Sequence, residues 1–283
     1  MATVSEQLNL SEHIRLPTDE EVASFREQGW AYLPQLVSRE LAHELLSHIK
    51  VIVDFPHDEM AEGSDGAQKV AMTVPAFALN PMPRLHDDFL RAYTESEQMG
   101  EAAARLTGIR PMRLVTDTVI FKLPEWTGAG NETDWHQDTP NMPLEPKTGC
   151  VQTWLSLCEI TPEMGAMQHL SGSHREGPVK ESGENMGSNT WTFEEFMAEF
   201  PQMSQYPLSE PHSFQPGDAL VHDGLCAHGA PVNATNRVRW AYTSYRIPAT
   251  TRYVGRPTSP WLDSLGLTRG QPFDHPLLPI VTQ

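Results

Sequence analysis

A change of hydrophobic periodicity near Gly108 constrains the fold of this chain more than any other feature. After that residue, β-branched and aromatic residues alternate with polar ones, in short runs separated by Gly, Pro, Asn and Asp. The segment 151–157 alternates most cleanly, because Gln152, Trp154 and Ser156 fall on one face of an extended strand. Further runs of this kind cover residues 113–123, 219–222 and 237–246. The second half of the chain is therefore predicted to be a set of short, antiparallel strands.

The part before Gly108 has helical signals instead. Thr18 and Glu21 form a capping box at the start of a short helix that Gly29 ends, and Ser38 caps a second helix with apolar residues at helical spacing. Residues 84–107 are predicted to be helical as well. Helices followed by strands predict a mainly β fold with flanking α-helices, either a β-sandwich or a jelly-roll barrel with a helical buttress.

One domain is expected to span residues 1–283. Residues 1–110 are assigned to the helical buttress and residues 111–250 to the β core. The core contains an insertion, residues 175–212, which is rich in Gly, Glu, Met and Ser and includes a short helix capped at Thr192. A segment of this length inside a β fold is often a lid or a substrate loop, and the alternative is a solvated excursion without function.

Composition excludes several classes of function. The net charge is −17, which disfavours a surface that binds nucleic acid or anionic membranes. No apolar run reaches the roughly 18 residues that a membrane-spanning helix needs, and no secretory signal is evident. The three cysteines lack any CxxC spacing, which indicates a reducing compartment. The expected location is the cytoplasm, and nothing in the composition favours a particular oligomeric state.

Three residues predict a metal site. His136 and Asp138 are two positions apart, so on an extended strand their side chains share one face. His228 supplies a third ligand from a distant β-rich segment, where Gly229 allows close approach of the backbone. Two histidines and one carboxylate leave three metal positions open, which is typical of non-haem Fe(II) oxygenases. A zinc hydrolase would use the same residue types, but more often has additional histidines nearby in sequence.

Two arginines follow the last candidate ligand. Arg237 and Arg239 come one hairpin later, and a guanidinium there can bind one end of a dicarboxylate through two parallel hydrogen bonds. This would be a local positive exception in an acidic protein. Both arginines share a strand face by parity, so their spacing does not choose between them.

Four ordered motifs resemble those of a known family. Together they are similar to the successive motifs of the phytanoyl-CoA dioxygenase (PhyH) family, the Fe(II)- and 2-oxoglutarate-dependent oxygenases built on a double-stranded β-helix of the jelly-roll, cupin-like type. The match runs in order over residues 113–246. The four motifs are Trp135–Asp138, Gly165–His174, Pro216–Asp218 and His228–Arg239.

The resemblance implies roles for individual residues. It makes His136, Asp138 and His228 the iron ligands, and it selects Arg239 over Arg237 for 2-oxoglutarate. Trp154 matches a tryptophan that borders the co-substrate, and Thr118 falls where another co-substrate contact is often found. His174 becomes a turn residue with a structural role.

Two positions depart from the family pattern. Ala230 stands where many relatives have a serine that helps to hold the co-substrate carboxylate, so another donor is expected to compensate. His169 occupies a place that is often large and apolar, and it is expected either to reach the substrate or to pack. Asp138 is the carboxylate that halogenating relatives lack, so hydroxylation is favoured over halogenation.

The predicted activity is hydroxylation of an unactivated C–H bond of a small metabolite or natural product, as in secondary metabolism. Fe(II) is the predicted cofactor, 2-oxoglutarate and O₂ are the co-substrates, and succinate and CO₂ are released. Desaturation, cyclisation or epimerisation by the same chemistry is one alternative; a catalytically silent binding protein and a metal-dependent hydrolase are others. No Lys/Arg cluster suits the phosphates of an acyl-CoA. Candidates for the outer pocket are Phe121, Lys122, Trp126, Asn141, Met142 and Trp191.

Overall fold

The computed structural model describes residues 9–60, 82–128, 132–180 and 191–283. A five-stranded antiparallel sheet dominates it, with β1 (Trp30–Leu33), β7 (Ala219–Asp223), β5 (Val151–Ser156), β9 (Arg239–Pro248) and β2 (Met112–Lys122) side by side in that order. A smaller antiparallel sheet contains β3 (Thr133–His136), β8 (His228–Ala230) and β6 (Gln168–His169). Short strands β4 (Leu144–Glu145) and β10 (Arg252–Tyr253) pair with each other.

The two sheets enclose an apolar interior. Trp154, Leu220 and Ala241 from the large sheet pack in one cluster with Ala230 and Met167 from the side of the small sheet. Two facing antiparallel sheets with long crossings between them form the jelly-roll, cupin-like fold that the sequence predicts. The predicted fold class, mainly β with flanking helices, is confirmed.

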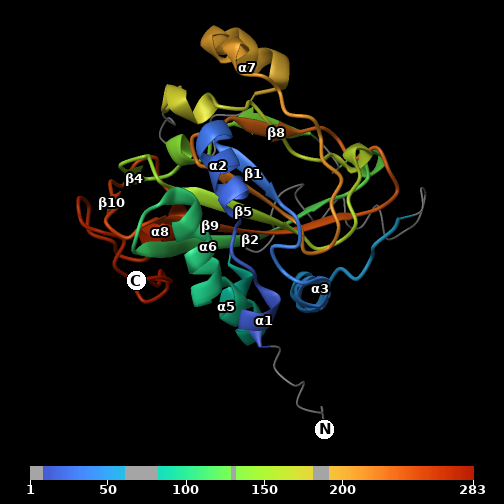
Figure 1. The fold of residues 1–283 in the computed structure, drawn as a ribbon, viewed down its shortest axis with the longest axis horizontal. Helices are drawn as coiled ribbons and strands as arrows, with labels where there is room; N and C mark the ends of the chain where they lie inside the picture. Colours follow the sequence, from blue (N-terminus) through green and yellow to red (C-terminus); the bar gives the residue numbers. More distant parts are fainter. Residues whose placement is uncertain (1–8, 61–81, 129–131, 181–190) are drawn as a thin grey trace.

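Helices cover the outer face of the large sheet (Figure 1). The main ones are α2 (Asp19–Gln28), α3 (Arg39–Val53), α5 (Asp88–Thr94) and α6 (Glu97–Thr107), and α1 (Leu10–His13) precedes them. Their buried side chains join those of the sheet in the largest apolar cluster of the protein. The capping box at Thr18, the left-handed Gly29 that ends α2 and the cap at Ser38 are all present. None of the helices in the described ranges is both long and apolar enough to cross a bilayer.

Residues 84–107 are mostly helical, as predicted, and form two helices. A 3₁₀ turn (Pro83–Leu85) precedes α5, and α5 ends at its C-cap, Glu95, before α6 begins. The physical reason is Ser96, which has an extended conformation and whose hydroxyl accepts a hydrogen bond from the backbone N–H of Met99, as the N-cap of a new helix.

The insertion packs on the outer side of the small sheet. In its described part, α7 (Phe193–Glu199) begins at the predicted capping box of Thr192 and buries Phe196 against Trp135 of β3. The insertion therefore covers a sheet face and is not a free excursion, while residues 181–190 lie outside the described residues. The C-terminal segment, which has no predicted element, contains α8 (Pro260–Ser264) and packs on the end of the large sheet.

Candidate metal centre

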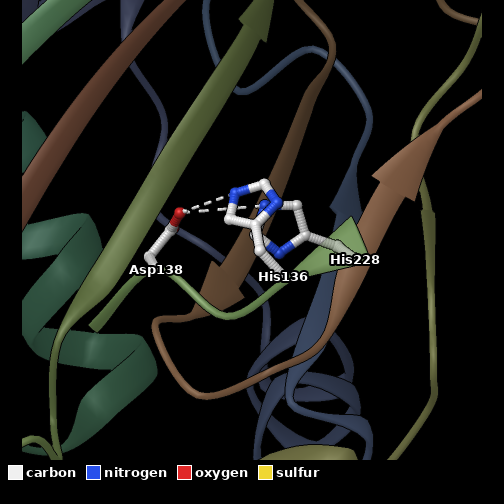
Figure 2. Close-up of side chains that lie close together, drawn as sticks. All are labelled: His136, Asp138 and His228. Atoms are coloured by element: carbon white, nitrogen blue, oxygen red, sulfur yellow. Dashed lines mark ion pairs between the residues drawn. The ribbon is translucent and has the colours of Figure 1, made fainter. Parts of the chain in front are cut away.

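The three predicted ligands converge between the two sheets (Figure 2). His136 ends β3 and lies directly opposite His228, which begins β8. Asp138 Oδ1 lies 3.4 Å from His136 Nε2 and 3.8 Å from His228 Nε2, and the three ligand atoms all fall within 4.8 Å of one another. In the described part of the chain, this is the group of three such side chains that could hold one metal ion.

His136 and Asp138 meet for a different reason from the one expected. The predicted geometry placed both on one extended strand, but β3 ends at His136 and Asp138 has helical backbone angles at the start of a 3₁₀ turn (Thr139–Asn141). The turn bends the carboxylate back toward the imidazole. Convergence is therefore produced by the end of the strand and not by its periodicity.

Backbone carbonyls fix the orientation of both imidazoles. His136 Nδ1 lies 2.7 Å from the carbonyl oxygen of Asp134, and His228 Nδ1 lies 3.0 Å from that of Cys226. A carbonyl only accepts hydrogen bonds, so each Nδ1 carries the proton and each Nε2 presents a lone pair toward Asp138. This is the arrangement that metal-ligating histidines usually have.

The second oxygen of Asp138 is held by residues of the large sheet. Gln152 Nε2 donates to Oδ2 over 3.2 Å, and His222 Nε2 lies 3.1 Å from the same oxygen. Burial opposes the charged carboxylate, but the neighbouring imidazoles of His228, His136 and His222 favour it more strongly and hold the pKa of Asp138 well below its usual range. Oδ1 is thereby left to face the two imidazoles as an anion.

His222 and Gln152 were not among the predicted site residues. His222 is fully buried, and its Nδ1 lies 3.3 Å from Nε2 of His169, whose ring stacks on Trp30 at 5.1 Å. His169 therefore packs behind the metal ligands and does not line the cavity beside them. The sequence contains one signal that could have indicated His222. His222 is two residues from Leu220 in the strand that follows the Pro216–Asp218 motif, so both side chains share one face of that strand.

A second polar group lies further along the interior. Arg239 is 2% exposed, its guanidinium lies 5.6 Å from the centroid of the Trp154 ring, and it donates to the carbonyl of Gly165. Among the described residues, none is a hydrogen-bond partner of its Nε or of the indole N–H of Trp154. Unpartnered buried donors are rare, and they suit a ligand with several acceptor oxygens.

The structure separates the two candidate arginines. Arg237 lies before β9 begins, on the surface, and pairs with Glu159 over 3.3 Å. Arg239, by contrast, points into the interior. The shared strand face expected for the two is wrong, because the residues up to Arg237 belong to a turn around Asn233. Thr118 lies on the inner face of β2 opposite Thr243, whose hydroxyl donates to the carbonyl of Thr118.

Some of the remaining predicted residues line a cavity at the site, and the others pack elsewhere. Asn141 and Met142 line a cavity beside His136 and Asp138. Lys122 is buried in the interior beside Arg239 and not in an outer pocket. Phe121, Trp126 and Trp191 pack in other apolar clusters, because strand parity and the insertion direct them away from the metal centre. His174 packs against Gly29, where a Cβ atom would lie 2.3 Å from its Nδ1, in keeping with the structural role that the resemblance implies.

The donor set suits iron and 2-oxoglutarate. Two neutral imidazole nitrogens and one carboxylate oxygen on one side of an ion are the ligands of non-haem Fe(II) sites with open positions. The unpartnered Arg239 Nε and Trp154 N–H lie in the same interior and can receive the carboxylate of a dianion.

Comparison with known proteins agrees with this site. The profile of the phytanoyl-CoA dioxygenase (PhyH) family matches residues 25–241. A protein from Arabidopsis thaliana described as phytanoyl-CoA dioxygenase is 26% identical over 199 residues, which cover 69% of this chain and 65% of that protein. The chain thus spans just under two thirds of the length of this relative.

Solved structures share the fold over nearly the whole chain. The non-haem α-ketoglutarate-dependent carbocyclase SnoK from nogalamycin biosynthesis has a TM-score of 0.75 at 21% identity, covering 94% of this chain and 97% of its own. The epimerase SnoN, in complex with Fe³⁺, α-ketoglutarate and nogalamycin RO, has a TM-score of 0.72 at 20% identity, covering 93% and 98%. EctD from S. alaskensis, with 2-oxoglutarate and 5-hydroxyectoine, has a TM-score of 0.66 at 17% identity, covering 98% and 93%.

The family profile covers most of the chain, includes every predicted metal ligand, and agrees with a fold that the solved relatives share. The family predicted from the motifs is confirmed. The chain belongs to the phytanoyl-CoA dioxygenase (PhyH) family of non-haem iron, 2-oxoglutarate-dependent oxygenases.

Proposed function

We propose that the protein is an Fe(II)- and 2-oxoglutarate-dependent dioxygenase that hydroxylates a small metabolite or natural product. His136, Asp138 and His228 are the iron ligands, and Arg239, Trp154 and Thr118 hold 2-oxoglutarate. The observation that carries the proposal is the combination of an open two-histidine, one-carboxylate group with a buried, partly unpartnered arginine in one interior. The enzyme works in the cytoplasm, in keeping with three cysteines that are all free thiols.

The residues of the chain prepare the site in three ways. The carbonyls of Asp134 and Cys226 set the imidazoles so that Nε2 faces the metal. Gln152 and His222 hold one oxygen of Asp138, which leaves the other for the metal. When bound, iron with 2-oxoglutarate and O₂ would supply the oxidising chemistry, with succinate and CO₂ as co-products.

Arg239 directs the co-substrate. Its guanidinium is fixed against the Trp154 ring, so it presents its N–H groups in one orientation to the distal carboxylate of 2-oxoglutarate. Burial lowers the pKa of Arg239 to about 10, which still leaves it charged at neutral pH. The enclosing apolar cluster keeps water from the pair and so strengthens the interaction.

Hydroxylation is the outcome we propose, because Asp138 is present as a metal ligand. Cyclisation or epimerisation is the second candidate, since two of the similar structures are described as a carbocyclase and an epimerase from nogalamycin biosynthesis. The same relatives support a role in secondary metabolism.

Anaerobic addition of Fe(II) and 2-oxoglutarate tests the proposal. The expected result is a weak visible charge-transfer band that Asp138→Ala and His136→Ala abolish. Folded protein without this band would contradict iron chelation, and a hydrolase would bind Zn(II) and turn over without O₂. A silent binding protein would show the band but release no succinate with any compound of a metabolite library.

A further inference from the structure

A cavity of about 300 Å³ opens beside the metal ligands. His136 and Asp138 lie at its inner end, and its walls include Met82, Met142 and Leu262. Arg239 and Trp154 are not among the residues that line it. This cavity therefore adjoins the metal ligands without including the Arg239–Trp154 pair, and it is placed for the primary substrate.

The far wall of the cavity lies beyond the part of the chain that matches the family profile. Ser259, Trp261 and Leu262 come from α8 and the residue before it, beyond the end of the family match at residue 241. The shape of the substrate space is thus set by a segment outside the part that the family profile describes.

The cavity offers almost no charge. Among the described residues that line it, the metal ligand Asp138 is the single charged side chain once His136 is set aside. A phosphate, carboxylate or ammonium group that entered it would lose its water without an opposite charge to replace it, at a cost of several kcal/mol. Acyl-CoA phosphates and zwitterionic amino acids do not suit such a lining.

The neutral polar groups in the wall belong to Thr116, Asn141, Gln152, Tyr245 and Ser259, and those of Asn141, Gln152 and Tyr245 already have hydrogen-bond partners. The Tyr245 hydroxyl lies 3.0 Å from that of Thr139, and Gln152 donates to Asp138. Hydroxyls of Thr116 and Ser259 also line the space. A ligand with one or two oxygen atoms can be satisfied here, whereas a sugar with many hydroxyls cannot. At about 300 Å³, the cavity is at the small end of the range for ligand pockets.

We propose that the primary substrate is a compact, uncharged and mainly apolar molecule with one or two hydroxyl or carbonyl oxygens. This assignment rests on the proposed iron centre, because the bond that reacts must lie beside His136 and Asp138.

Three bicyclic probes of matched size test the charge rule by calorimetry: 2-tetralone (neutral), 2-naphthoate (anionic) and 2-aminotetralin (cationic), added to the anaerobic enzyme with Fe(II) and 2-oxoglutarate. We expect 2-tetralone to bind about tenfold more tightly than either charged probe, a difference of about 1.4 kcal/mol. Met142→Lys, which places a cation in the wall, is expected to reverse the preference toward 2-naphthoate. Trp126→Phe, outside the cavity, is the matched control and should change nothing.

The substrate class is overturned if a charged probe binds as tightly as 2-tetralone, if Met142→Lys leaves the preference unchanged, or if 2-tetralone fails to bind at about 1 mM. The charge-transfer band is recorded in the same samples. A sample with the band but without the charge preference contradicts only the substrate class, whereas loss of the band contradicts the proposed function itself.

A second, independent observation concerns Lys122. It lies directly opposite Arg239 in the pairing of β2 with β9, and each of the two side chains is 2% exposed. Lys122 Nζ donates to the carbonyls of Pro231 (2.6 Å) and Ala230 (3.3 Å). Within the described ranges no carboxylate oxygen lies within 4 Å of either cation, in contrast to the buried Arg84.

Two adjacent buried basic groups are unfavourable when both are charged, and the charge of Glu132 offsets this only in part for Lys122. Burial, and next the charge of Arg239, lower the pKa of Lys122 to about 6. An anion placed between them would relieve both the repulsion and the lack of a partner. The position of Lys122 also matters, because its amine reaches the backbone of Ala230, the residue that replaces the carboxylate-binding serine of relatives.

We infer that Lys122 is a second positioning residue for the distal carboxylate of 2-oxoglutarate and provides the contact that Ala230 lacks. The inference rests on the proposed co-substrate role of Arg239.

Titration of the charge-transfer band tests it, with 2-oxoglutarate and with 2-oxopentanoate, which lacks the distal carboxylate. Lys122→Met should raise the Kd for 2-oxoglutarate about tenfold and leave that for 2-oxopentanoate unchanged. Adding Ala230→Ser to Lys122→Met should recover part of the affinity. Lys122→Gln, which keeps an N–H donor for the two carbonyls but no charge, should behave like Lys122→Met.

A purely structural lysine would give a different pattern. Equal weakening of both keto acids, full affinity in Lys122→Gln, or no recovery by Ala230→Ser would each overturn the inference. If every variant gives a normal charge-transfer band and binds 2-oxopentanoate with the same weak affinity, the iron centre itself is intact.

Discussion

Strands β2 and β9 carry buried charged side chains on both of their faces. The two faces differ in the partners that these side chains have. On the outer face, Asp117 lies 2.9 Å from Arg84 Nε and accepts a hydrogen bond from the hydroxyl of Tyr242 over 2.6 Å. On the inner face, Lys122 and Arg239 donate to backbone carbonyls and have no carboxylate partner in the described chain. Asp117 and Arg84 are thus paired within the protein, whereas Lys122 and Arg239 have no such partner in the described chain and can receive one from a ligand.

Breaking the outer pair gives the largest expected effect. Asp117→Ala leaves Arg84 buried without this partner, and we expect a loss of about 3–5 kcal/mol in the free energy of unfolding. Urea denaturation measures it. Asp19→Ala removes an exposed partner of Arg105 and, as the control, should cost less than about 1 kcal/mol. Equal losses in the two variants would remove the distinction between the pairs.

The inner face should respond in the opposite way. Arg239→Met removes a buried charge that has no partner in the free protein, so its stability in urea should be unchanged or higher. The cost should fall on the co-substrate, with the 2-oxoglutarate requirement raised on the order of 100-fold, which is about 2.7 kcal/mol. A large loss of stability with an unchanged requirement would show that Arg239 is structural.

Local motifs predicted the elements that depend on neighbouring residues. The helix caps, the strand runs and the ligands His136, Asp138 and His228 all follow from residue types at fixed spacing. Even where the predicted strand geometry was wrong, as at Asp138, the motif identified a residue that the structure brings together with His136 and His228.

Residues brought in by crossing strands were not predictable in this way. His222 and Gln152 reach Asp138 only because β7 and β5 are neighbours in the large sheet, a pairing that no local pattern encodes. Lys122 was assigned to an outer pocket because its strand parity was known but its partner strand was not. The α8 wall lies in a segment without periodicity or motif, so its role emerges only from packing.

The metal centre is intermediate between the two faces, because Asp138 has protein partners for one oxygen and keeps the other for a ligand. Gln152→Leu removes one of these partners, and we expect the affinity for Fe(II) to fall about tenfold, the lower end for such supporting contacts. Anaerobic metal titration without substrate measures it. Thr153→Val, the next residue on the opposite face of β5, should leave metal affinity unchanged. A fall in both variants would indicate a general loss of packing.

Asp223 provides the smallest and most specific test, since it is a largely buried carboxylate that accepts a hydrogen bond from the backbone N–H of Leu225. Burial raises its pKa to about 6. Its native pKa thus exceeds the unfolded value of about 3.9, so the folded state binds more protons between these values and stability falls as the pH rises through them. In the metal-free protein, Asp223→Asn keeps an acceptor oxygen but removes the charge.

The variant should match the wild type near about pH 3, where the carboxyl is mostly protonated in both states, and exceed it by about 1 kcal/mol above about pH 7. This figure is lower than the full linkage value, because Asp223 retains some contact with solvent. Urea denaturation across this pH range measures the difference. A constant difference in the free energy of unfolding, or a gain only at low pH, would mean that the Asp223 charge is compensated within the fold, as that of Asp117 is. The contrast between structural and ligand-directed charges would then not extend to the end of β7.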